Sequence, residues 1–256
     1  MLVLLSCAKT MSAVSKVKVP LTTIPRFQKE AAEIALQMSQ FSVDELERLL
    51  RVNAKIAVEN YKRYQAFHAE TTPELPALLA YTGIVFKRLN PKDFSAEDFG
   101  YAQEHLRLTS FCYGLLRPLD VIRAYRLEGD VVLPELGNQT MFSYWQSRLT
   151  DIFIEDIKNA GGILCNLASD EMKNLFDWKR VEKEVRVITP GFQVWKNGKW
   201  ASVVIYIKMS RGEMTRFVLK NKIENPEELK HFSWEGFEFD ESLSDEKKFV
   251  FTNGKE

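Results

Sequence analysis

The sequence contains little of what marks disulfide-stabilised, zinc-binding or membrane-spanning proteins. Its three cysteines, Cys7, Cys112 and Cys165, lie far apart and form neither a CxxC pair nor a zinc-ligand spacing, which excludes a disulfide framework and the common zinc motifs. The three histidines occur without an HExxH or triad pattern. No apolar run approaches the ~18 residues of a membrane-spanning helix. We therefore expect no metal site, no cofactor and no membrane partner.

Net charge is also lacking, because 35 basic and 35 acidic residues give a formal charge of +0. Bulk attraction to nucleic acid or to a membrane surface is thereby excluded, and any such binding must come from the local distribution of charge. The apolar run at the start, Leu2 to Leu5, is too short for a secretory signal and has no basic residue before it. We interpret this run as a buried strand of a cytoplasmic protein, with a monomer as the working oligomeric state.

Charge is instead segregated along the chain. The segment 1–29 holds five basic residues and no acidic one, and 173–222 holds twelve basic and four acidic residues. The segment 223–256 reverses the balance, with four basic and ten acidic residues. Two interpretations stay open. Either the acidic segment folds back and neutralises the basic one as part of an ordinary solvated surface, or the basic residues line a groove that meets phosphates.

Helix-start signals locate a helical hairpin near the N-terminus. Ser42 and Glu45 have the spacing of a capping box, which predicts a helix over 43–50. A second helix is expected over 53–67 after a short connection, so the pair forms a helical hairpin over about 43–67. Such a hairpin can present amides and lysines to a DNA backbone. Because it lacks the glycine-rich turn usual in DNA-binding helical hairpins, plain packing in the core is an equal alternative.

The remaining expected elements mix helices with strands. Ser95 and Asp98 repeat the capping box, and Asn197-Gly198 is the preferred turn of a β-hairpin. The expected helices cover 26–39, 96–108, 140–158 and 212–221, and the expected strands cover 2–5, 163–167, 192–207 and a terminal pair around Phe237, Phe239, Phe249 and Phe251. An antiparallel hairpin that occurs late favours an α+β fold over regular βαβ repetition. We predict a single compact domain of mixed helices and strands over 1–256, with helices around a central sheet that includes an antiparallel hairpin.

The arginine-rich stretch 105–128 is the strongest candidate for binding an anion. Its arginines are interleaved with aromatic residues and broken by glycine and proline, a pattern too irregular for one helix. Arg107, Arg117 and Arg126 offer guanidinium forks, which match phosphate or carboxylate oxygens with paired donors. Lys9, in the small-residue turn after the first strand, can add an ammonium beside backbone amides. For Lys9, an ordinary strand-to-loop turn is the plainer interpretation.

A second basic cluster follows the expected hairpin. Lys208, Arg211 and Arg216 straddle the end of the expected strand and the start of the next helix, and Gly212 would let a ligand approach the backbone closely. The cluster suits phosphate contacts. A solvated helix face is the alternative.

The segment NLASDE follows an expected buried strand, where loops commonly present functional groups. Asp170 and Glu171 could act as general acid and base, while Asn166 and Ser169 could contact an anion. Ser169 and Asp170 could equally cap the next helix. A third idea, iron capture by Asp170, Glu171 and Glu128, matches no recognised iron motif.

Taken together, these motifs resemble the YaaA family of bacterial peroxide stress proteins. The segment 6–10 is similar to the S-P-A-K-T start of that family, 105–120 to its HLR...YG.LRPLD block and 125–128 to its YRLE. Further along, 166–171 is similar to its NLASDE, 208–217 to its K..RG.M.RF and 232–239 to its F...G[YF].F. The resemblance covers nearly the whole chain, with the blocks in order.

The departures from the family pattern spare the charged residues. Cys7 replaces the usual proline, Phe111-Cys112 replaces Gly-Leu, Ala124 replaces a proline, and the glycine of YRLEMG moves to Gly129. These differences bear on loop geometry at the expected site.

The resemblance implies a cytoplasmic protein that helps cells survive hydrogen peroxide by limiting free iron and hydroxyl-radical damage to DNA. It also implies a single compact α+β fold with a positively charged cleft, affinity for DNA and a helix-hairpin-helix-like element.

Two hypotheses for the site follow. In the first, the protein binds double-stranded DNA through its phosphate backbone. The residues expected at this nucleic-acid or anion site are Lys9, Arg107, Arg117, Arg126, Asn166, Ser169, Lys208, Arg211 and Arg216. In the second, an enzyme acts on a nucleotide or damaged base in the same cleft, with Asp170 or Glu171 as acid or base and Glu128 as a further candidate. The sequence leaves open whether any turnover occurs.

Overall fold

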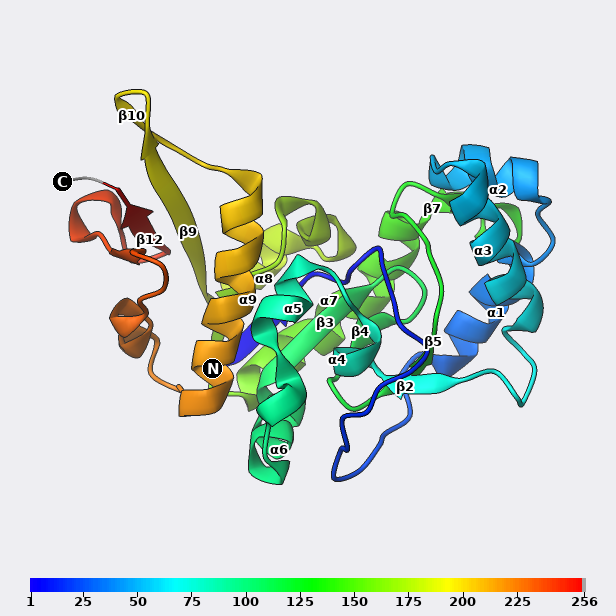
Figure 1. Cartoon of the computed structure of the whole chain (residues 1–256), viewed down its shortest axis with the longest axis horizontal. Coiled ribbons are helices and arrows are strands. Elements are labelled where there is room, and N and C mark those ends of the chain that lie inside the picture. Colours follow the sequence, from blue (N-terminus) through cyan, green and yellow to red (C-terminus); the bar gives the residue numbers. More distant parts are fainter. Residues whose placement is uncertain (255–256) are drawn as a thin grey trace.

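The computed structural model describes residues 1–254, and its centre is an eight-stranded mixed sheet (Figure 1). The strand order is β11-β12-β9-β8-β1-β3-β4, and β10 pairs with β9. The strands of this sheet are β1 (Leu2–Leu5), β3 (Leu106–Ser110), β4 (Gly114–Leu116), β8 (Ile163–Asn166), β9 (Arg186–Lys196), β10 (Lys199–Ala201), β11 (Glu238–Phe239) and β12 (Lys248–Asn253). Two small antiparallel sheets join β2 (Glu74–Pro76) to β5 (Val121–Arg123) and β6 (Val132–Leu133) to β7 (Gln139–Thr140).

Strand β1 lies in the middle of the sheet, with a parallel neighbour on each side. Val3 pairs with Leu106 of β3 and with Cys165 of β8, and all four residues of β1 are buried. A parallel strand enclosed in this way needs apolar side chains at every position, which explains why Leu2–Leu5 shows no alternation. The expected buried strand is confirmed.

The antiparallel pairs lie toward the margins of the sheet. In the β9–β10 hairpin, Asn197 and Gly198 have φ values of 53° and 76°, the left-handed pair that a type I′ turn requires. The expected terminal pair is also confirmed, since Phe239 of β11 is opposite Phe251 of β12. The fold class is α+β, as expected. The parallel centre was not expected, because the strands that form it are separated by long stretches of chain.

Helices surround the sheet. The α-helices are α1 (Gln28–Met38), α2 (Val43–Leu50), α3 (Ala54–Ala66), α4 (Ala77–Ala80), α5 (Ile84–Leu89), α6 (Ala96–His105), α7 (Met141–Asn159), α8 (Trp178–Glu184) and α9 (Val204–Asn221). The 3-10 helices are η1 (Pro91–Asp93), η2 (Pro134–Leu136), η3 (Asp170–Leu175), η4 (Pro226–His231) and η5 (Glu241–Leu243). Figure 1 shows α1, α2 and α3 at one end of the molecule and the β9–β10 hairpin at the other. No helix within residues 1–254 is long and apolar enough to cross a membrane.

The helical hairpin expected over 43–67 is confirmed as α2 and α3. The Ser42 hydroxyl accepts a hydrogen bond from the Glu45 N–H, and the Glu45 carboxylate accepts one from the Ser42 N–H at 2.8 Å. Asn53 then caps α3 by accepting a hydrogen bond from the Ile56 N–H at 3.0 Å. These caps satisfy backbone donors that a helix start otherwise leaves unpaired, so the sequence fixes both helix starts locally.

We predicted that a strand continues to Ile207, and this prediction is wrong beyond β10. The chain instead enters α9, which begins at Val204 and not near Gly212. The segment 203–207 is rich in β-branched residues and locally prefers a strand, but packing of α9 on α5 overrides that preference. The two helices meet at Gly212, where an added Cβ would lie 2.2 Å from the carbonyl oxygen of Val85. The glycine therefore allows a helix contact, and not the approach of a ligand that we expected.

The basic segment 173–222 is neutralised less by the C-terminal acids than by the chain around α6. Arg216, Lys220 and Lys222 pair with acids between 93 and 98, at 2.5 to 3.2 Å. Within residues 1–254, one ion pair joins the basic segment to the C-terminal acids. It links Arg186 to Glu227 at 3.6 Å. Neutralisation by fold-back is therefore a minor part of the charge balance.

Candidate functional site

The strands around β1 create a switch point at one end of the sheet. The chain passes from β1 to β3 on one side and later returns to β8 on the other side. In open sheets with parallel strands, ligands bind outside the carboxyl ends of the strands at such a point. The residues that directly follow β1, β3 and β8 all line one pocket. The topology therefore places a candidate site here without reference to any motif.

The pocket has a volume of about 400 Å³. Its walls come from the loops after the three strands, from α5, from the segment 125–128 and from α9. Apolar side chains such as Phe86, Phe111 and Met172 form much of the lining, together with a few charged groups. The charged residues of the lining are Lys9, Arg126, Glu128, Glu171, Lys208 and Arg211. This size and composition are typical of a site for a small organic ligand.

The charged lining is positive, because four cations face two carboxylates and leave a formal charge of +2. Lys9 comes from the loop after β1 and Arg126 from the segment 125–128, while Lys208 and Arg211 are three residues apart on α9 and so share one face of that helix. A concave site with cations and low-dielectric walls concentrates its field on an anion. Cations from three distant parts of the sequence thus converge.

Glu128 contacts two of these cations. Its Oε2 lies 2.8 Å from Lys9 Nζ, and its Oε1 lies 3.2 Å from Arg126 Nη2. The side chains of Arg126 and Glu128 are each 15% exposed, whereas that of Lys9 is 67% exposed. Tyr64 of α3 donates a hydrogen bond to the Arg126 carbonyl oxygen at 2.6 Å. The helical hairpin therefore supports this wall of the pocket.

Several buried polar atoms around the pocket have no hydrogen-bond partner. Arg126 Nε, Glu128 Oε1 and Arg211 Nε belong to lining residues, and Asn166 Nδ2 lies at the end of β8. Burial lowers the pKa of the Arg211 guanidinium, yet arginine stays charged at any working pH. Since nearly all buried polar atoms in proteins are paired, their concentration here indicates a place for a polar ligand.

The loops after β1 and β8 are tied together by hydroxyls. Ser6 Oγ accepts a hydrogen bond from the Ser169 N–H at 2.8 Å, and the two hydroxyls are 3.2 Å apart. The neighbouring Cys7 donates its N–H to Thr109 Oγ1 at 3.2 Å. Burial raises the pKa of the Cys7 thiol to about 12, so the thiol is neutral at physiological pH and is not an activated nucleophile.

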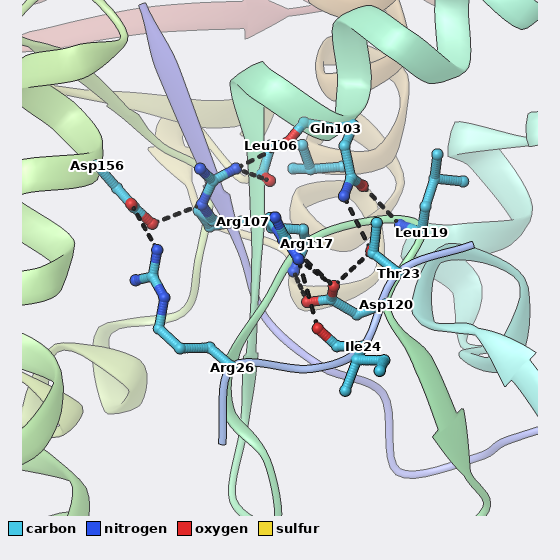
Figure 2. Close-up of polar contacts among 10 residues, drawn as sticks. All are labelled: Thr23, Ile24, Arg26, Gln103, Leu106, Arg107, Arg117, Leu119, Asp120 and Asp156. Atoms are coloured by element: carbon cyan, nitrogen blue, oxygen red, sulfur yellow. Dashed lines mark hydrogen bonds and ion pairs between the residues drawn. The ribbon is translucent and has the colours of Figure 1, made fainter. Parts of the chain in front are cut away.

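Arg107, expected to bind an anion, lies outside the pocket and serves the core. Its Nε donates to Asp156 Oδ2 at 2.7 Å, and its Nη1 donates to the carbonyl oxygens of Gln103 and Leu106 (Figure 2). Asp156 also accepts from Arg26 Nη2 at 3.3 Å. The Arg107 side chain is only 9% exposed, so its guanidinium is committed to acceptors within the protein. Arg107 is therefore not among the expected residues that the pocket brings together.

Arg117 is committed in a similar way. Its Nε and Nη2 donate to Asp120 Oδ1 at 3.2 and 3.0 Å. The same carboxylate oxygen accepts from the Thr23 hydroxyl at 2.6 Å, and Gln103 joins Thr23 to the Leu119 N–H (Figure 2). This network fastens the long N-terminal loop to the arginine-rich stretch, and Arg117 does not line the pocket.

Three further expected residues, Asn166, Arg216 and Asp170, are absent from the pocket lining, although Asn166 directly precedes the lining residue Leu167. Arg216 pairs with Asp93 at 2.5 Å and donates to the Asn90 carbonyl oxygen, which anchors α9 to η1. Asp170 begins η3 with a side chain that is 90% exposed. Its hydrogen bond with Lys173, at 2.8 Å, lowers the pKa of Asp170. An exposed, ionised carboxylate at a helix start does not suit general acid–base chemistry, which leaves Glu171 and Glu128 in the pocket.

The three carboxylates considered for iron do not form a metal site. Asp170 pairs with Lys173 outside the pocket, and Glu128 is engaged by Lys9 and Arg126. Within residues 1–254, no group of three or more His, Cys, Asp or Glu side chains is placed to hold a metal ion.

Two parts of the pocket were not among the expected site residues. The short helix α5 contributes its first three residues, 84–86, and packs on α9 at Gly212. Tyr125 lines the pocket while its hydroxyl is hydrogen-bonded to Ser110 at 2.6 Å and to Tyr81 at 2.8 Å. The resemblance to YRLE was the one signal that could have indicated Tyr125.

Known proteins similar to this chain match it over all or nearly all of its length. A family model described as peroxide stress protein YaaA matches residues 1–243. A UPF0246 protein of Bacteroides thetaiotaomicron is 91% identical over 254 residues, which cover 99% of each chain. A UPF0246 protein of Bacteroides fragilis is 79% identical over 255 residues, covering 100% of this chain and 99% of the relative. A UPF0246 protein of Crocosphaera subtropica is 36% identical over 252 residues, covering 98% and 99%. The resemblance carried by the motifs is confirmed, and the chain belongs to the peroxide stress protein YaaA family.

Proposed function

We propose that this protein protects DNA in the cytoplasm during peroxide stress by binding it at the pocket of the switch point. The observation that carries the proposal is the convergence of four cations around buried donors that lack a partner in the protein. Phosphates satisfy such donors, and arginine binds them through paired hydrogen bonds. Membership of a peroxide stress family supplies the physiological setting. Protein bound to DNA would shield it from iron-dependent oxidative damage.

The size of the pocket limits which part of DNA can enter. A pocket of about 400 Å³ accommodates one nucleotide and not a duplex. An unpaired nucleotide is already available, whereas a paired base must first leave the stack at a cost of a few kcal/mol. We therefore expect tighter binding to DNA with unpaired nucleotides than to a perfect duplex. Exposed cations such as Lys9 would contact the neighbouring backbone.

The number of available cations sets the expected salt dependence. Arg117 and Arg216 are paired with Asp120 and Asp93, and Arg126 is held by Glu128. The remaining phosphate contacts are the exposed Lys9, together with Lys208 and Arg211. Three contacts predict that log affinity falls with log salt at a slope of roughly −3 for a duplex and about −2 for a single strand. Affinity that does not change with salt would contradict backbone binding.

Charge reversal tests whether the pocket is the binding site. We expect the double substitution Lys208→Glu and Arg211→Glu to abolish most DNA binding, measured by fluorescence anisotropy with an oligonucleotide that contains a single-stranded gap. The matched control is Lys179→Glu with Lys183→Glu, which makes the same charge change on exposed positions of α8. If both double variants lose affinity equally, binding depends on total charge and the pocket is not the site.

A second candidate is turnover of a nucleotide or damaged base in the same pocket. It is favoured by the presence of two carboxylates, Glu128 and Glu171, beside fixed cations in the lining, an arrangement that acid–base chemistry can use. Oligonucleotides with oxidised bases would be incubated with the protein, and the products followed by mass spectrometry. A product that Glu128→Gln or Glu171→Gln abolishes supports turnover, whereas an unchanged substrate with the wild-type protein contradicts it.

A further inference from the structure

Glu128 and Arg126 line the pocket, and each has a buried polar atom without a hydrogen-bond partner. The inference that follows rests on the proposed binding of nucleotides in this pocket. We propose that Glu128 and Arg126 read the pairing edge of an unpaired nucleobase, while Lys208 and Arg211 hold its phosphate. Glu128 is then a specificity-determining residue, because it selects a nucleotide over other phosphate esters.

The cations of the pocket fall into two groups. Lys9 and Arg126 share the carboxylate of Glu128, at 2.8 and 3.2 Å, and an anion at that wall would have to displace it. Lys208 and Arg211 come from α9 on another wall, and Arg211 Nε is buried without a hydrogen-bond partner. Charge repulsion therefore directs an incoming phosphate away from Glu128 and toward α9.

The wall at Glu128 offers one donor and one acceptor. Glu128 Oε1 is buried and accepts no hydrogen bond, although it lies 3.2 Å from Arg126 Nη2, and Arg126 Nε is buried with no acceptor. A ligand that fits both atoms carries an N–H donor next to an acceptor. Every nucleobase has that arrangement on its pairing edge, and enzymes that take up flipped bases read this edge with hydrogen bonds. A phosphate group alone has no such edge.

The rest of the wall supports this assignment. Phe111 and Tyr125 line the same pocket with only 3% and 4% of their surface exposed, so they provide an apolar wall for a base. The Tyr64 hydroxyl donates a hydrogen bond to the Arg126 carbonyl oxygen at 2.6 Å. This bond fixes the backbone that carries Arg126 and Glu128 before a ligand binds. A pairing edge is free only in an unpaired nucleotide, so the inference also explains the expected preference for unpaired DNA.

The test separates the base from the phosphate by using three small ligands. Thymidine 5′-monophosphate carries the base edge, deoxyribose 5-phosphate carries only sugar hydroxyls, and phenyl phosphate carries a ring without a donor. Binding to wild type, Glu128→Met and Glu128→Gln is measured by isothermal titration calorimetry, with Glu155→Met, at an exposed carboxylate of α7 outside the pocket, as the control for loss of one negative charge. Thermal unfolding verifies that each variant is folded. If Glu128→Met does not fold, the milder substitution Glu128→Gln takes its place in the test.

We expect Glu128→Met to weaken binding of thymidine 5′-monophosphate by about 10- to 100-fold, because a hydrogen bond to a charged acceptor is lost. Phenyl phosphate should bind equally or more tightly, since a negative charge is removed from the pocket. Glu155→Met should change the preference between these ligands by less than about twofold.

Three outcomes would overturn the inference. If Glu128→Met tightens all three ligands alike, Glu128 is only a counter-ion for Lys9 and Arg126. If deoxyribose 5-phosphate loses as much affinity as the nucleotide, the sugar and not the base contacts Glu128. If the wild-type protein binds none of the three, the proposed nucleotide pocket itself fails, and the inference fails with it.

Discussion

The contact between α5 and α9 depends on Gly212, and replacing this glycine by alanine should disturb both stability and the pocket. The added Cβ would lie 2.2 Å from the carbonyl oxygen of Val85, 3.0 Å from its carbonyl carbon and 2.8 Å from Arg88 Cβ. Two of these atoms belong to the backbone of α5 and cannot rotate away, so the helices must separate. Since Val85 and Arg211 both line the pocket, their separation should also weaken anion binding.

Two opposing contributions decide the sign of the stability change. Alanine is favoured over glycine in a helix interior by about 1 kcal/mol, whereas inserting atoms into a packed contact typically costs 1–3 kcal/mol and more when backbone must shift. For Gly212→Ala we expect the clash to prevail, with a net loss of about 1 to 2 kcal/mol. For a chain of this size, that loss lowers Tm by roughly 2 to 8 °C.

Gly100 provides the matched control. It lies within α6, its surface is exposed, and an added Cβ would meet no atom within 4 Å. Gly100→Ala should therefore stabilise the protein by up to about 1 kcal/mol. Urea unfolding followed by circular dichroism gives both free energies. If Gly212→Ala stabilises the protein as Gly100→Ala does, the close contact with α5 does not exist and the reasoning is refuted.

Three further predictions concern buried charges and the thiol of Cys7. Burial disfavours the ionised form of Asp98, but hydrogen bonds led by that of Lys220 outweigh it and lower its pKa from 3.8 to about 2. Because the pKa of Asp98 is depressed in the folded state, its ionised form adds ~2 kcal/mol to the free energy of unfolding. This contribution is complete above about pH 4 and is lost as the pH falls toward 2. In acid titrations followed by fluorescence, Asp98→Asn should remove this part of the pH dependence, and an unchanged acid limb would contradict the assignment. Asp156→Asn should cost about 3 to 5 kcal/mol in urea unfolding, because the buried Arg107 charge loses its counter-ion, while a cost below about 1 kcal/mol would mean that the pair is solvated. Cys7, with its pKa of about 12 against an ordinary 9.0, should react with iodoacetamide at neutral pH on the order of a thousandfold more slowly than an unperturbed thiol; labelling at the ordinary rate would contradict its burial.

The sequence by itself determined the parts of the fold that depend on neighbouring residues. The capping boxes at Ser42 and Ser95 and the turn at Asn197 act within four residues, so their signals survive in any context. The buried strand Leu2–Leu5 was equally clear. Ordered motifs along the whole chain were enough to indicate the family.

Only the tertiary structure decided which cations are available to a ligand. Arg107 pairs with Asp156, 49 positions away, and Arg216 pairs with Asp93, 123 positions away, so neither pairing leaves a local signal. Arg126 lies in the same arginine-rich stretch as Arg107, and Arg211 lies on α9 with Arg216, but both Arg126 and Arg211 keep buried donors without partners at the pocket. The same long-range packing turned a strand-like segment into the start of α9. Residue type fixes the charge that a side chain carries, whereas the acceptors that surround it after folding fix whether that charge can bind a ligand.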